Sequence, residues 1–175
     1  MNTRLVSMAS ALVMLAGVAV SSTAHAGVRG HFARPNAEGG FTGGRFAAHA
    51  GPNGGGFARG RMTQSDGAGN VSTARGGVFR GPNGGQGGRA GTTSVGADGS
   101  VAHQSGFAAS GSQGQIQSQG TFNRNADGSA SGERNTTATG ANGNTYQGTT
   151  TYTKGEGVSH TGTCADAAGN VIACR

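Results

Sequence analysis

Large apolar residues are sparse beyond residue 26, and they alternate with small or polar residues instead of recurring at the spacing of a helix face. The clearest predicted strand is segment 145–153, which is rich in β-branched and aromatic residues. Tyr146 and Tyr152 lie six residues apart in it, so an extended backbone places both on one face. Further strands are predicted at 101–108, 115–122, 135–139, 158–164 and 171–174. Glycine recurs too often for two uninterrupted helical turns, so we predict a mostly β fold.

Glycine-containing turns separate these segments at nearly even intervals. Ala-Asp-Gly-Ser occurs at 97–100 and again at 126–129, and further turn signals lie at 110–114, 141–144, 154–157 and 166–170. Asp-Gly and Asn-Gly favour hairpins because Gly reaches positive φ without a Cβ clash. A spacing of roughly 12 to 16 residues is typical of strand plus turn in an antiparallel meander.

Residues 27–90 give weaker strand signals. Gly-Pro-Asn-Gly-Gly at 51–55 recurs at 81–85, thirty residues later, with another turn signal midway at 66–70. This spacing predicts a repeat of two strands and two turns. The intervening segments are rich in Gly and Arg, however, so we predict disorder over 27–58, and the sequence leaves 59–90 undecided.

The chain is therefore divided into three parts. We predict a cleaved signal helix at 1–26, a Gly/Arg-rich low-complexity segment at 27–90, and a β-hairpin repeat region at 91–175. The C-terminal half is expected to form an antiparallel β-meander or β-repeat sheet. From residue 27 onward only 19 residues are Val, Ile, Leu, Met, Phe, Tyr or Trp, too few for a conventional core. We expect backbone pairing to determine the shape.

The N-terminal residues have the three parts of a secretory signal. Arg4 precedes an apolar segment, 5–20, and small residues end in an Ala-His-Ala pattern that predicts cleavage after Ala26. The apolar segment is shorter than the roughly 20 residues that a membrane-spanning helix needs. We expect a bacterial secreted protein, in the periplasm, at the cell surface or outside the cell, with no membrane span once the signal is removed.

Positive charge is concentrated in one half of the chain. Segment 27–90 carries eight arginines against Glu38 and Asp66, whereas 91–175 is close to neutral. The planar guanidinium pairs phosphate or carboxylate in a bidentate manner and stacks on aromatic rings. Since these arginines are interleaved with Gly and Phe, as in the Arg-Gly-Gly segments of RNA-binding proteins, they are candidate polyanion-binding residues. They are Arg29, Arg34, Arg45, Arg59, Arg61, Arg75, Arg80 and Arg89.

The two cysteines, Cys164 and Cys174, suit the oxidising compartment that a signal peptide implies. We predict a disulfide across the last hairpin, with Ala165 opposite Ala173 and a loop of odd length around Gly169. A metal-binding or redox-active pair is the alternative, but the spacing is not Cys-x-x-Cys and no His ligand is close in sequence.

No catalytic constellation is found. The histidines beyond the leader, His31, His49, His103 and His160, lie at no metal-ligand spacing. We expect no enzyme activity, no cofactor, no metal site and no specific nucleic-acid partner.

The leader, the Gly-Pro-Asn-Gly-Gly turns, the 142–146 segment and the Cys164 and Cys174 hairpin together resemble small secreted Gly-rich repeat proteins of proteobacteria. Segment 110–120 is also similar to curli-type subunits in its Gln, Ser and Gly spacing. The resemblance implies no known activity. Two hypotheses follow: a non-catalytic structural or interaction protein of the cell envelope or extracellular matrix that self-associates, or a module binding lipopolysaccharide, acidic polysaccharide or extracellular DNA.

Overall fold

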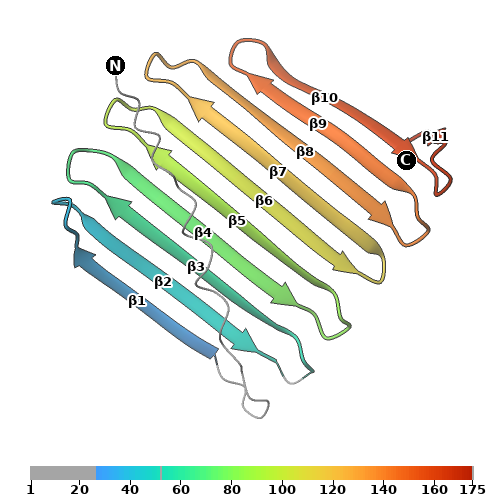
Figure 1. Ribbon diagram of the computed structural model, residues 1–175, viewed down its shortest axis with the longest axis horizontal. Helices are drawn as coiled ribbons and strands as arrows, with labels where there is room; N and C mark the ends of the chain where they lie inside the picture. The colour runs from blue at the N-terminus through green and yellow to red at the C-terminus, as the bar shows by residue number, and fades with distance from the viewer. Residues whose placement is uncertain (1–26, 52, 175) are drawn as a thin grey trace.

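The computed structural model describes residues 27–51 and 53–174, and these form one sheet of eleven antiparallel strands. The spatial order of the strands equals their order in the chain, so the sheet is an uninterrupted meander (Figure 1). The predicted leader and its cleavage site lie outside the described residues. The strands are β1 (Gly27–Pro35), β2 (Phe41–Ala50), β3 (Gly56–Ser65), β4 (Val71–Arg80), β5 (Gln86–Val95), β6 (Val101–Gly111), β7 (Gly114–Arg124), β8 (Ala130–Gly140), β9 (Thr145–Thr153), β10 (Gly157–Ala165) and β11 (Val171–Ile172).

Most of the turns share one hydrogen-bonded geometry. In the β5–β6 turn, Gly99 has φ +81°, its amide donates to the carbonyl of Gly96 at 2.9 Å, and the carboxylate of Asp98 accepts from the amide of Ser100 at 2.9 Å. The β7–β8 turn repeats these bonds with Gly128 and Asp127. Only Gly adopts this φ without strain, which is why the turns could be located from sequence.

Side-chain hydrogen bonds link consecutive turns at one end of the strands. The side chain of Asn36 donates to the carbonyl of Ser65 at 2.7 Å, and that of Asn70 accepts from the amide of Ala97 at 2.9 Å. Further along, Arg124 donates to the carbonyl of Gly99 and Lys154 to that of Gly128, each at 2.8 Å. These bonds add to the ladder in holding the strand order.

The register repeats every thirty residues over the first five strands. Residue 29 of β1, residue 59 of β3 and residue 89 of β5 occupy equivalent positions along their strands, because the intervening pairings Arg29–Ala47, Ala47–Arg59, Arg59–Gly77 and Gly77–Arg89 are all direct. The predicted two-strand, two-turn repeat of thirty residues is confirmed. Side chains thirty residues apart therefore lie in one row across the sheet.

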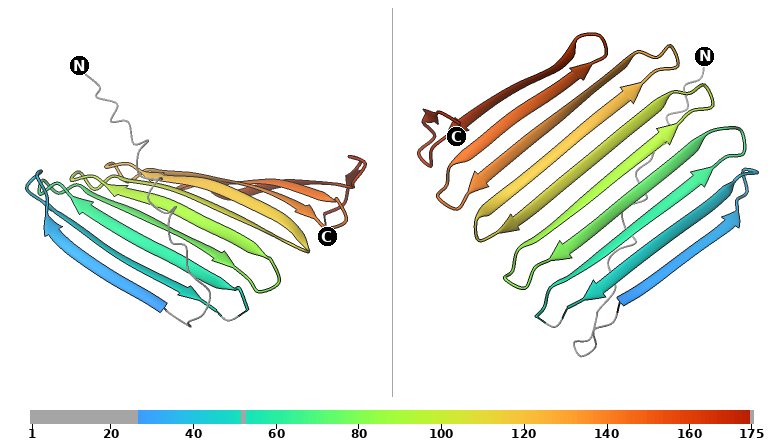
Figure 2. Two further views of the ribbon diagram at one scale, coloured as in Figure 1. Left: turned by 60° about the horizontal axis from the view of Figure 1, so that its bottom comes forward. Right: turned by 180° about the vertical axis from the view of Figure 1, so that it is seen from behind.

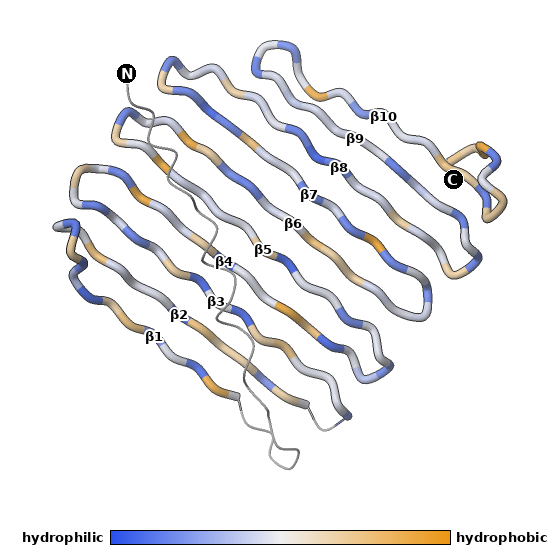
Figure 3. The backbone as a smooth tube through the Cα atoms, in the orientation of Figure 1, coloured by the Kyte–Doolittle hydropathy of each residue, from blue (hydrophilic) through white to orange (hydrophobic). Residues whose placement is uncertain are grey.

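The sheet is a single layer. No residue is buried in the part of the chain that the structure describes, and Figure 2 shows the described strands as one twisted layer. Polar residues are prominent in the turns at both ends of the strands (Figure 3). The predicted mostly β antiparallel meander is confirmed, and backbone pairing holds it without a core. Among the described residues, no helix is long and apolar enough to cross a bilayer.

The meander also includes the segment that was expected to be disordered. Residues 27–90 form β1 to β4 and the first half of β5, so the proposed boundary at residue 90 falls inside a strand. The prediction of disorder over 27–58 was wrong for the described residues there, because it weighed strand propensity one segment at a time. Segment 59–90, which the sequence left undecided, also belongs to the meander. The repeated turns fix the register there, and each strand gains a full ladder from its neighbours.

The C-terminal hairpin contains the predicted disulfide in a different register. Cys164 and Cys174 are bonded, with Cα atoms 5.3 Å apart. Ala165 pairs with Val171, not with Ala173, so Cys164 faces Ile172 and Cys174 lies beyond β11. The register differs because Asp166 closes a five-residue turn, accepting from the amides of Ala168 and Asn170.

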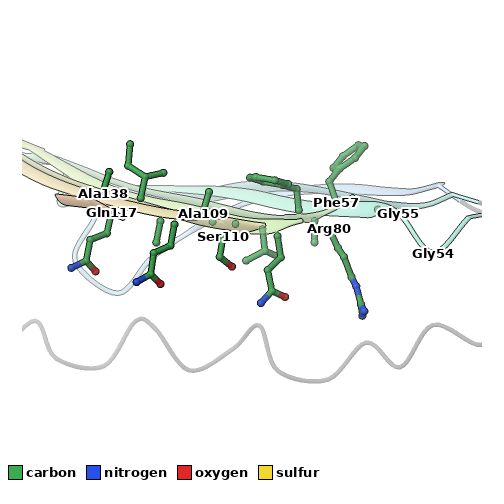
Figure 4. A pocket seen from close by; sticks show the side chains of 18 of the residues that line it. Gly54, Gly55, Phe57, Arg80, Ala109, Ser110, Gln117 and Ala138 are labelled. Carbon is green, nitrogen blue, oxygen red and sulfur yellow. The ribbon is translucent and has the colours of Figure 1, made fainter. Parts of the chain in front are cut away.

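The two faces of the sheet carry different side chains. We define face A as the face that bears Phe57, Ala109 and Ala138, and face B as the face that bears Arg80, Ser110 and Gln117; Figure 4 shows the two sets pointing in opposite directions. Directly paired residues share a face, and neighbours along a strand alternate. The register therefore assigns each strand residue to one face. Tyr146 and Tyr152 both lie on face A, as predicted.

Candidate functional site: an arginine groove on face A

The first row of the candidate site consists of arginines at thirty-residue intervals. Arg29, Arg59 and Arg89 lie on alternate strands β1, β3 and β5, all on face A. Ala47 and Gly77 occupy the same row on the intervening strands. Because strands are about 4.8 Å apart, successive arginines of this row are separated by about 10 Å. The alternation with small residues leaves each guanidinium room to move.

The second row brings three arginines together on adjacent strands. Arg45 of β2 pairs directly with Arg61 of β3, and Arg61 pairs with Arg75 of β4. His31 precedes them in the row on β1. Directly opposed residues have Cβ atoms about 5 Å apart, and like charges in such positions repel.

A groove runs between these two rows, across the strands. Its floor is the backbone of Gly30, Gly60, Gly76 and Gly106, whose positions are oriented toward face B. The arginines of both rows form its walls. The floor lacks side chains, so a ligand can approach the backbone closely.

Arg134 of β8 extends the groove and was not among the predicted residues. It occupies the second row, opposite Gly120, and its guanidinium donates to Ser118 Oγ at 3.0 Å and Ser105 Oγ at 3.2 Å. From Arg29 on β1 to Arg134 on β8 the site spans seven strand intervals, about 34 Å. The pairing of β6, β7 and β8 brings Arg134 into the row, and residue spacing alone gave no signal for it.

The predicted arginines divide unequally between the faces. Six of the eight lie on face A; Arg34 and Arg80 lie on face B, opposite Thr42 and Gln86. The six on face A are Arg29, Arg45, Arg59, Arg61, Arg75 and Arg89. The thirty-residue spacing of Arg29, Arg59 and Arg89, and of Arg45 and Arg75, is visible in the sequence and indicates the two rows. It does not include Arg61, and it does not show that the two rows share a face.

No carboxylate lies on face A within the described strands. Glu133 is the only acidic residue on a strand, and it pairs with Thr151 on face B. The other acidic residues lie in turns, at the ends of the strands. These are Glu38, Asp66, Asp98, Asp127, Glu156 and Asp166. The arginine groove is therefore not neutralised by its own sheet.

The four aspartates of these turns already accept hydrogen bonds within their own turns. A hydrogen bond from the Asn70 side chain, followed by one from the Ala68 amide, lowers the pKa of Asp66 below its ordinary value. The pKa of Asp98 is lowered in the same way by the side chain and amide of Ser100. These carboxylates hold their own turns together.

Aromatic rings lie next to the groove on face A. The guanidinium carbon of Arg59 is 5.6 Å from the centroid of the Phe57 ring, within the range of a cation–π contact. Phe107 occupies the first row beyond Arg89 and also lines the groove. Guanidinium planes and aromatic rings together suit a ligand with both charge and flat surfaces.

The histidines on strands also lie on face A, but two of them bond to hydroxyl groups. His103 Nδ1 is 2.8 Å from Thr93 Oγ1, and His160 bonds Thr150 and Tyr146. Within the described ranges, no group of three or more His, Cys, Asp or Glu is arranged to hold a metal ion. The guanidinium groups of the two arginine rows lie on the same face as these histidines.

No protein family, curated protein or solved structure matches the chain.

Proposed function

We propose that this protein is a non-catalytic binding protein whose arginine groove on face A holds an extended polyanion. The observation that carries the proposal is the contiguous trio of Arg45, Arg61 and Arg75 on a face whose described strands bear no carboxylate. Repulsion within the trio disfavours the free sheet. A polyanion removes this repulsion on binding, and the free energy gained contributes to affinity.

The shared chemistry of the ligand is a flexible chain with regularly spaced phosphate or carboxylate groups. Arginine pairs such groups in a bidentate manner, and a groove of about 34 Å accommodates several of them. Lipopolysaccharide, acidic polysaccharide and extracellular DNA are the three sources. The leader sequence and the disulfide between Cys164 and Cys174 support a location in the cell envelope or extracellular matrix, where all three occur.

The test compares two double variants with the same change in net charge. Arg61→Gln/Arg75→Gln removes charge from face A, and Arg34→Gln/Arg80→Gln removes it from face B. Binding is measured at increasing salt with three probes: lipopolysaccharide vesicles, polygalacturonate and a single-stranded oligonucleotide. The probe bound most tightly at physiological salt identifies the source of the anion.

We expect the face A variant to bind at least about tenfold more weakly, while the face B variant stays close to wild type. For the oligonucleotide, the salt slope should fall by about 1.4, because each lost phosphate contact removes about 0.7. Equal weakening by both variants would show that only net charge matters, and would refute a site on face A. Absence of binding to every probe at low salt would remove the function altogether.

A further inference from the structure

Face B carries an uncharged apolar patch over β1 to β6. It consists of the three rows that start at Val28, Gly30 and Phe32 on β1 and end at Ala108, Gly106 and Gln104 on β6. Sixteen of its eighteen positions are Gly, Ala, Val, Phe or Met. From β7 onward the same rows turn polar, with Gln117, Gln119 and Glu133.

The large side chains of this patch are uncovered in the single sheet. Val78 is 55% exposed, Phe46 52% and Val28 50%. Large apolar side chains grouped on one face are unfavourable in water, and a contiguous patch of this kind marks an interaction surface.

The aromatic rings in the patch lie close to the sheet. Phe32 faces Gly44 and Phe46 faces Gly30 in adjacent pairs, and each ring covers the glycine opposite. A Cβ at Gly44 would lie 2.6 Å from the Phe32 ring. The two rings therefore lie flat on the sheet and project little from it, so another sheet can approach this face closely.

We propose that a second copy of this chain covers the patch, face B to face B. Three rows are about 20 Å long and six strands about 29 Å wide, so the contact buries about 600 Å² per copy, or about 1,200 Å² in all. This area reaches the size of a specific interface. The assembly goes beyond polyanion binding, since it uses the opposite face and leaves both arginine grooves facing outward.

The charges of face B set the arrangement of the two copies. A two-fold axis parallel to the strands, between β3 and β4, places β1 to β6 of one copy on β6 to β1 of the other. The polar rows of β7 to β10, with Glu133, then stay in water. Arg34 and Arg80 border the patch at opposite ends of the strands, where their guanidinium groups remain solvated.

The test uses two neighbouring alanines of β2 that point to opposite faces. Ala48 lies on face B and Ala47 on face A. The full chain, Ala48→Glu, Ala74→Glu on β4 face B and the matched control Ala47→Glu are compared by sedimentation equilibrium. Far-ultraviolet circular dichroism checks that each variant keeps its β structure.

We expect a wild-type dimer, a dissociation constant raised at least about tenfold by each face B glutamate, and little change for Ala47→Glu. A wild-type monomer at all concentrations overturns the proposal, as does equal weakening by Ala47→Glu. If the wild-type chain is a monomer that co-floats with phosphatidylcholine vesicles in a density gradient, the patch binds a lipid surface and not a second copy.

Small-angle X-ray scattering of the wild type gives a second measurement that needs no variant. Stacked sheets are about 10 Å apart, so a face-to-face dimer is about twice as thick as one sheet. A dimer or polymer as thin as one sheet would mean pairing through the open edges of β1 and β10, and would refute face B as the interface. Loss of polyanion binding would leave the dimer unaffected, so the two proposals fail separately.

Discussion

Arg61 on β3 lies directly opposite Arg75 on β4, on a face whose described strands carry no carboxylate. Arg45 flanks Arg61 on the other side, which makes Arg61 the central charge of three. Such an arrangement reduces the stability of the sheet by itself. It is consistent with the proposed binding of a polyanion.

Replacing the central arginine should stabilise the free protein. Arg61→Gln removes two repulsive pairs, and we expect the free energy of unfolding in urea to rise by about 0.2–1 kcal/mol at low salt. The gain should shrink at 1 M salt, where the screening length falls to about 3 Å. Arg34→Gln, opposite Thr42, is the control and should change stability little. A lower free energy of unfolding for Arg61→Gln would contradict the inferred repulsion among the three arginines.

Two strand glycines should respond differently to alanine. A Cβ at Gly60 meets only the Arg45 carbonyl oxygen at 3.6 Å, whereas a Cβ at Gly44 meets the Phe32 ring at 2.6 Å. We expect Gly60→Ala to stabilise the sheet by about 0.5–1 kcal/mol, since glycine costs entropy in a strand. The displaced ring should cancel that gain in Gly44→Ala. Chemical denaturation of both variants measures the difference, and equal gains would mean that the ring does not cover Gly44.

Loss of the disulfide should act locally. Replacing both Cys164 and Cys174 by Ser opens a ring of eleven residues, which the loop-closure model values at about 2.5–3 kcal/mol. We expect faster amide hydrogen exchange in β11 and at the adjoining end of β10, because only two residue pairs hold β11 to the sheet. The amides of β3 to β5 serve as the internal reference. Faster exchange there as well would show that the hairpin stabilises the whole sheet.

Acid should weaken the turns. Asp66 and Asp166 occupy equivalent positions in their turns. Hydrogen bonds from the side chain and amide of Asn70 lower the pKa of Asp66, and those from the side chain and amide of Asn170 lower the pKa of Asp166. A carboxyl whose pKa is depressed by folding adds stability above its unfolded pKa, and this contribution disappears as pH falls through the folded pKa. The midpoint temperature of thermal unfolding should therefore decrease as the pH is lowered below about 4.

Two variants isolate the contribution of these carboxylates. Asp66→Asn and Asp166→Asn should each flatten the acid dependence of the thermal midpoint. Glu38→Gln is the control, because Asn36, not Glu38, accepts the amide hydrogen bonds of its turn. An unchanged acid dependence in both aspartate variants would contradict the role of the carboxylates.

Much of the fold could be predicted locally. The segment 145–153 is β9 with the predicted bounds, and Gly99, Gly128 and Gly143 adopt positive φ in predicted turns. The register of the last hairpin could not be predicted, since the five-residue turn closed by Asp166 moved the pairing by two residues. For the candidate site, Arg29 and Arg45 could be named as basic residues, but their shared face depended on pairing across strands.

The sequence by itself determined where the chain turns, because Gly after Asp or Asn fixes the local backbone without help from distant residues. Only the tertiary structure decided which side chains meet. Arg134 joins Arg75 in one row through the pairing of five strands, β4 to β8. The tertiary structure also decided that residues 27–51 and 53–90 belong to the sheet and its turns, since weak strands form when a neighbour on each side satisfies their backbone hydrogen bonds.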